Sequence, residues 1–130
     1  MRRMKAEVQK AKHMLSTSTE YEMTIDSLAK DEDFEMTITR DQFEEVCANL
    51  FVAGIPCVEK CLEDGKVDKG QVDDIVLVGG TSRIPKVQSV LSNYFDGKQL
   101  CFRVNPDEAV AYGATVQAAM LTDQTDDEEQ

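Results

Sequence analysis

The 130-residue chain contains no tryptophan and one histidine, and no apolar run approaches the roughly 18–20 residues that cross a membrane. Polar residues follow its basic first residues, so the sequence predicts no signal peptide. The net charge of −11 makes duplex nucleic acid and anionic membrane surfaces poor partners. We therefore expect one soluble globular domain that binds neither nucleic acid nor membrane.

The four cysteines, Cys47, Cys57, Cys61 and Cys101, form no C-x-x-C pair. Cys57 and Cys61 are four residues apart on a predicted helix, a spacing that alone is no metal site. We expect all four to be reduced and either buried or half-buried. Reduced cysteines are typical of a reducing compartment, which favours a cytoplasmic location.

Hydrophobic periodicity organises the first half of the chain. Apolar residues at steps of three and four predict an amphipathic helix over residues 1–18. Alternating polar and apolar residues over 20–39 predict half-buried antiparallel strands. Thr39 and Gln42 form a capping box, so a helix should start near residue 40. In that helix Pro56 favours a kink, and its buried face should include Val46 and Leu50.

The second half begins with Ile75–Val78, an apolar run that suits a central strand covered on both faces. A Gly-Gly turn follows, and Pro85 then suits the first turn of a helix. Asn105 is predicted to cap a last helix that has Pro106 at its first position. Residues 122–130 are acidic and predict a disordered tail.

Two features could carry chemistry. The strand, Gly79-Gly80 and the following helix could hold an anion on backbone N–H groups, with Thr81, Ser82 and Arg83 as further donors. A tight connection without a ligand is an equally good interpretation of that spacing. The second feature is a polar stripe on the first helix, which a solvated face also explains; its members are Gln9, Lys12, His13 and Ser16. Neither His13 nor any carboxylate pair makes a case for acid–base catalysis.

Four segments together resemble the ATPase domain of the heat shock protein 70 (DnaK-type) chaperones. They are residues 11–18 (AKHMLSTS), 34–45 (FEMTITRDQFEE), 75–88 (IVLVGGTSRIPKVQ) and 104–114 (VNPDEAVAYGA). The resemblance covers about residues 2–121. It implies an α/β fold: part of one lobe of an actin-like (ribonuclease H-like) ATPase, with an antiparallel β-meander and helices joined to a core strand with two helices. Residues 1–66 would be a peripheral subdomain of lobe II and 67–121 part of its core subdomain.

The resemblance also implies roles for single residues. Lys12 would contact the ribose, and Ser16 the adenine of ATP or ADP. His13 and Arg83 would flank the adenine ring. The remaining residues would line the nucleotide or the edge of the base site; they are Gly79, Gly80, Thr81 and Asp107. The family usually has Arg in place of His13 and Glu in place of Gln9, and losing Arg weakens the stacking partner.

The first lobe, with its catalytic and Mg²⁺-binding groups, is not part of this sequence, so we expect no catalysis by this chain alone. The parent would be an ATP-dependent chaperone in protein folding and the stress response. The resemblance implies unfolded polypeptides, nucleotide-exchange factors and J-domain co-chaperones as its partners. Two alternatives stay open: a non-catalytic docking module for exchange factors, and a pseudo-chaperone with altered nucleotide recognition.

Overall fold

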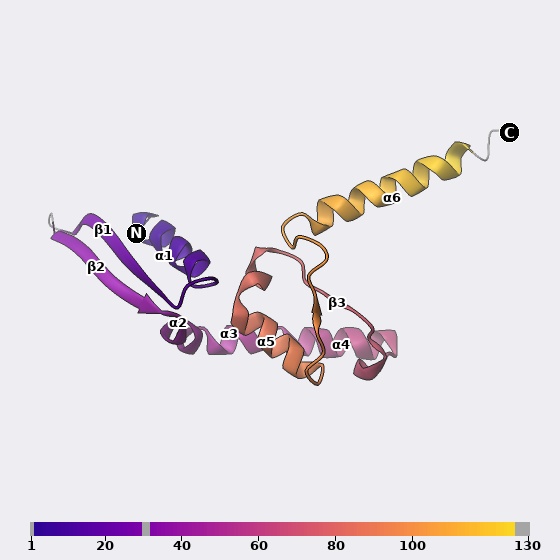
Figure 1. Ribbon diagram of the computed structural model, residues 1–130, viewed down its shortest axis with the longest axis horizontal. Coiled ribbons are helices and arrows are strands. Elements are labelled where there is room, and N and C mark those ends of the chain that lie inside the picture. Colours follow the sequence, from indigo (N-terminus) through magenta and orange to yellow (C-terminus); the bar gives the residue numbers. More distant parts are fainter. Residues whose placement is uncertain (1, 30–31, 127–130) are drawn as a thin grey trace.

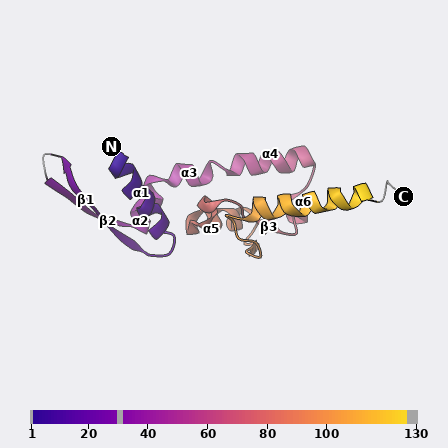
Figure 2. The same ribbon diagram turned by 90° about the horizontal axis from the view of Figure 1, so that it is seen from above.

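The computed structural model describes residues 2–29 and 32–126 and forms an elongated series of packed elements (Figure 1). At one end, helix α1 (Arg2–Met14) packs against β1 (Glu20–Ala29), which pairs with β2 (Glu32–Thr39). At the other end, α6 (Ala109–Asp126) projects away from the remaining elements in Figure 1, and its C-terminal part extends beyond α4 in Figure 2. No helix in the described part of the chain is long and apolar enough to cross a membrane.

The hairpin confirms the predicted antiparallel strands. Met23 faces Met36 across the strand pair, and Met23 and Ile25 are buried beneath α1 together with Ala11 and Leu15. Burial of this stripe places the polar stripe of α1 on another face, because residues three and four apart share one side of a helix. The predicted meander was wrong in extent, since in the described residues the sheet has two strands.

Three helices follow the hairpin: α2 (Arg40–Val46), α3 (Ala48–Val52) and α4 (Ile55–Gly65). The Thr39–Gln42 capping box at the start of α2 is present as predicted. Pro56 does not kink a continuous helix; it lies in the first turn of α4, where its missing N–H has no intrahelical partner to lose. The predicted buried face was wrong for Val46 and Leu50, which are 85% and 74% exposed.

The core piece consists of β3 (Ile75–Val76), the 3₁₀ helix η2 (Gly80–Arg83), α5 (Pro85–Tyr94) and β4 (Leu100–Cys101), preceded by a short 3₁₀ helix η1 (Lys69–Gln71). β3 and β4 pair in parallel, and α5 packs against α3. The predicted strand over residues 75–78 was therefore too long. It is also not covered on both faces, because Val76 and Val78 are about half exposed.

The last helix starts at Ala109 rather than at Asn105, because Asn105 caps a turn instead: its Oδ1 accepts from the Asp107 N–H at 3.2 Å. At the other end α6 continues through Asp126, into the range of residues 122–130 for which the sequence predicts a disordered tail. Residues 127–130 of the predicted tail lie outside the described residues. Every side chain over residues 110–122 is exposed.

The cysteines differ from the prediction in their burial. All four are free, and Cys47 and Cys101 are half-buried as expected. Cys57 and Cys61 are exposed instead, because the half-buried face of α4 is formed by Ile55, Val58 and Leu62.

Candidate functional site

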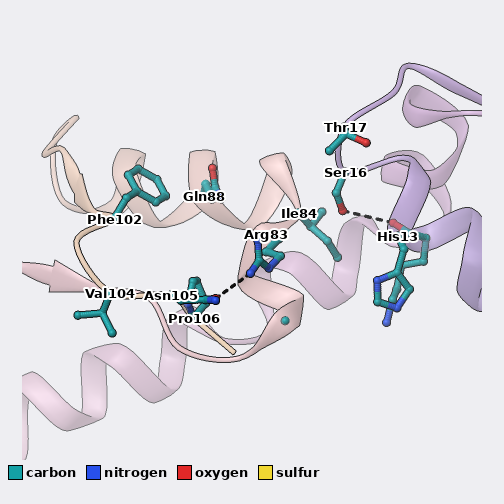
Figure 3. A pocket seen from close by; sticks show the side chains of 12 residues that line it. His13, Ser16, Thr17, Arg83, Ile84, Gln88, Phe102, Val104, Asn105 and Pro106 are labelled. Carbon is teal, nitrogen blue, oxygen red and sulfur yellow. Dashed lines mark hydrogen bonds between the residues drawn. The ribbon is translucent and has the colours of Figure 1, made fainter. Parts of the chain in front are cut away.

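The last turn of α1 supplies one wall of the candidate site. Ala11 and Leu15 are 3% and 1% exposed, so they fix the orientation of the helix on β1. His13 and Ser16 lie on the side of this helix end that borders a cavity (Figure 3), and Lys12 also lines that cavity. The Ser16 hydroxyl donates to the Lys12 carbonyl at 3.3 Å, which holds it at the end of the helix. The apolar stripe thus determines where the polar stripe lies.

Arg40, at the start of α2, holds the turn that follows α1. Its Nε donates to the Leu15 carbonyl and its Nη2 to the Ser18 carbonyl, both at 2.8 Å. These carbonyls belong to the end of α1 and the loop after it, where backbone acceptors lack intrahelical partners. The guanidinium therefore fixes the segment that carries Ser16, although the sequence alone did not single out Arg40.

The Gly-Gly loop supplies the second wall. Gly79 has φ = +85°, a conformation that glycine adopts without steric cost, and its N–H donates to the Pro106 carbonyl at 2.8 Å. The buried Ser82 closes the turn, since its hydroxyl and its N–H donate to the Gly79 carbonyl at 2.7 and 3.1 Å. A Cβ on Gly80 would stand 3.1 Å from Asp107 Oδ1. A side chain at position 80 would therefore require the Asp107 carboxylate to shift by a few tenths of an ångström.

Arg83 links this loop to the segment before α6. Its Nη2 donates to Asp107 Oδ2 at 2.6 Å and to Asn105 Oδ1 at 2.8 Å, and its Nε donates to the same Asp107 oxygen at 3.1 Å. The Arg83 side chain remains 50% exposed. The guanidinium edge is therefore held by Asp107 and Asn105 while part of the group stays accessible on the cavity wall.

These two walls, together with α5 and the 102–106 segment, line a cavity of about 520 Å³, within the range of small-molecule sites. The residues that line it come from α1, the Gly-Gly loop, α5 and the 102–106 segment (Figure 3); they are Lys12, His13, Ser16, Thr17, Gly80, Arg83, Ile84, Gln88, Phe102, Val104, Asn105 and Pro106. None of these described lining residues is acidic, although the whole chain carries −11. Such a cavity can accept a planar apolar group together with an anion.

Five of the eight predicted site residues line the cavity: Lys12, His13, Ser16, Gly80 and Arg83. Three do not, namely Gly79, Thr81 and Asp107. Gly79 shapes the turn and Asp107 acts through its ion pair with Arg83. Thr81 is exposed in η2 and offers no side-chain contact to the cavity that the structure records.

Sequence reasoning missed the 102–106 wall. Phe102 and Val104 add apolar surface there, and Asn105 anchors Arg83. Asn105 and Pro106 were interpreted as the start of a helix, since their order fits a cap and a first turn. Gln88 was also missed; its Nε2 donates to the Ser82 carbonyl at 2.9 Å and ties α5 to the loop.

Comparison with known proteins identifies the family of the chain. The model of the family described as "Hsp70 protein" matches residues 1–130. The chain is 51% identical over 129 residues to a ribosome-associated molecular chaperone of Candida glabrata and 50% identical to a ribosome-associated molecular chaperone of Saccharomyces cerevisiae, covering 99% of this chain and 21% of each relative. It is also 52% identical over 122 residues to heat shock cognate 70 kDa protein 3 of Dictyostelium discoideum, covering 94% of this chain and 19% of that relative.

The chain therefore belongs to the Hsp70 family. It spans about a fifth of the length of these curated relatives. The mixed α/β structure, with its antiparallel hairpin and several helices, is consistent with part of the ATPase region of such a protein.

Proposed function

We propose that this chain forms the adenosine-binding side of a nucleotide site in an ATP-dependent molecular chaperone. The observation that supports this most directly is the convergence of Lys12, His13 and Ser16 with Gly80 and Arg83 on one cavity. These two groups of residues are more than 60 positions apart in the sequence. The family resemblance implies a nucleotide contact for each group.

The donor set fits an adenosine nucleotide. His13 on α1 and Arg83 on the loop each present a planar side chain to the cavity, so a purine ring could stack between them. Lys12 would reach a ribose hydroxyl or a phosphate, and Ser16 offers a hydroxyl for the base edge. Gly80 lacks a Cβ and lets the ligand approach the backbone.

The catalytic activity would belong to a longer protein of which this chain forms a part. In the described residues no group of three or more His, Cys, Asp or Glu side chains could hold a metal ion. As the family resemblance implies, Mg²⁺ and the groups that promote phosphoryl transfer would belong to the first lobe, and residues 1–66 and 67–121 to the peripheral and core subdomains of lobe II. Exchange factors, J-domain co-chaperones and unfolded polypeptides would be partners of that whole protein, acting in the cytoplasm.

Calorimetric titration of the chain with ADP tests the site. The Arg83→Ala variant should weaken ADP binding by about two- to thirtyfold, as expected from loss of a cation over a π-system. The matched control is Arg2→Ala, which removes an exposed arginine at the far end of α1. Equal ADP affinity in both variants would contradict the proposal, and no ADP binding by the unchanged chain would leave only the docking role for exchange factors.

His13 supports a second candidate, in which base recognition is altered in a pseudo-chaperone. The side chain lines the cavity at the position where the family usually has Arg, and an imidazole lacks the permanent charge of a guanidinium. The His13→Arg variant should then bind ADP about two- to tenfold more tightly. An unchanged ADP affinity would rule this candidate out.

A further inference from the structure

Two exposed thiols lie side by side on α4, outside the candidate site. Cys57 and Cys61 are the third and seventh residues of the helix, and both are exposed and free. Residues four apart on a helix have Cβ atoms about 5–6 Å from each other on one face. Rotation about χ1 brings the two sulfur atoms within the reach of a single bridging ion.

The number of ligands selects the ion. Structural zinc sites are tetrahedral with four protein ligands, and iron–sulfur clusters take four cysteines. No cluster of three or more His, Cys, Asp or Glu side chains that could hold a metal exists in residues 2–29 and 32–126. Two thiolates alone satisfy a soft ion that accepts linear two-coordinate geometry, which among the first-row metals is Cu(I).

Charged side chains of both signs flank the pair. Lys60 lies three residues after Cys57 and brings a positive charge beside its sulfur atom, and Asp64 lies three residues after Cys61. Cys57 is in the first turn of α4, where the helix dipole favours negative charge. We propose that Cys57 and Cys61 form a binding site for one Cu(I) ion on the surface of this lobe.

Binding is a ligand exchange without redox change. Both S–H bonds break, two Cu–S bonds form, and the two protons go to solvent, so that copper stays Cu(I) and the complex carries one negative charge. The bridge would also span one turn of α4 and hold the helix in its folded conformation.

The test supplies Cu(I) to the reduced 130-residue chain as its bis-bicinchoninate complex and follows loss of the colour of that complex. We expect one Cu(I) ion per chain at an affinity at least tenfold above that of the Cys57→Ser/Cys61→Ser variant. That variant keeps the half-buried Cys47 and Cys101, so it measures binding by the other thiols. Cu(I) should also raise the unfolding temperature of the unchanged chain and not that of the variant.

A geometric control separates paired thiols from thiol number. The Glu59→Cys/Cys61→Ser variant has as many thiols as the unchanged chain, but its two α4 cysteines are two residues apart and do not share a face. Residue 59 is exposed, so the substitution should leave the fold intact. This variant should bind Cu(I) as weakly as the double serine variant. Equal Cu(I) affinity in the control and the unchanged chain would overturn the proposal, as would equal affinity in the double serine variant.

Discussion

Arg83 and Asp107 form the ion pair that joins the Gly-Gly loop to the segment before α6, with Nη2 and Oδ2 2.6 Å apart. Both side chains are about half exposed, so we expect the pair to contribute modestly to affinity, by orienting the guanidinium. The Asp107→Asn variant should weaken ADP binding by about two- to fivefold, the range expected for an exposed ion pair. Calorimetric titration of the variant and the unchanged chain with ADP measures this difference in affinity.

The control for that variant is Asp96→Asn. Asp96 forms a comparably exposed ion pair with Lys69 at 2.8 Å, away from the cavity. The Asp96→Asn variant should leave the ADP affinity unchanged. A loss of affinity as large in Asp96→Asn as in Asp107→Asn would show that the effect is general electrostatics rather than the position of Arg83.

Gly79 offers a test of the loop backbone. Because its φ is +85°, an alanine there should destabilise the fold by roughly 1–2 kcal/mol and distort the wall formed by Gly80. Gly97, with φ = +82°, is the matched control outside the cavity. Both variants should lower the free energy of unfolding in urea, and only Gly79→Ala should also lower the ADP affinity. Equal ADP affinities in the two variants would contradict the assigned role of the loop.

Arg40 offers a test of how α1 is positioned. Arg40→Met should cost about 1.5–3 kcal/mol, because the hydrogen bonds to the Leu15 and Ser18 carbonyls are made by a charged, part-buried group. The same variant should weaken ADP binding, since Ser16 lies between those carbonyls in the sequence. Arg3 also donates to two backbone carbonyls, but it is exposed and far from the cavity. Arg3→Met should therefore lower stability less in urea unfolding and leave ADP binding unchanged.

The contact between α1 and β1 should be sensitive to acid. Glu7 accepts from Lys10 at 2.8 Å and from Tyr21 at 2.7 Å, and these hydrogen bonds, that of Lys10 first, hold the pKa of Glu7 below its ordinary value of 4.5. The folded state thus favours the carboxylate. This stabilisation is present above pH 4.5 and is lost as the pH falls through the lowered pKa.

Thermal unfolding between about pH 3 and 7 measures the effect. The drop in unfolding temperature in acid should be smaller in Glu7→Gln than in the unchanged chain. Glu22→Gln, at an exposed position on β1, should keep the full drop. An acid response of Glu7→Gln equal to that of the unchanged chain would show that this carboxylate does not contribute.

The sequence predicted local structure wherever neighbouring residues decide it. The Thr39–Gln42 capping box, the alternation along the hairpin and the first-turn position of Pro85 were all confirmed. Prediction failed where a distant partner decides, as at Asn105, whose side chain binds Arg83 and the turn of Asp107 instead of capping a helix. Five of the predicted site residues line one cavity. The contribution of Phe102 to the same cavity was not predictable, because it depends on tertiary contact.

The prediction of which side chains are buried was wrong for a related reason. The Ile75–Val78 run has the composition of a strand covered on both faces, yet Val76 and Val78 are about half exposed. On α6, Val110 and Tyr112 are 71% and 66% exposed. Because the chain spans about a fifth of its relatives, we propose that the remaining part of a longer protein covers these faces.

The most direct test is to mix this chain with a fragment that supplies the upstream part of such an ATPase domain. ATP hydrolysis and ADP binding are then measured for each component and for the mixture. We expect that only the mixture hydrolyses ATP, and that Arg83→Ala in this chain weakens ADP binding by the mixture. A stable complex that neither binds ADP nor hydrolyses ATP, or one that is indifferent to Arg83→Ala, would contradict the proposed adenosine-binding role.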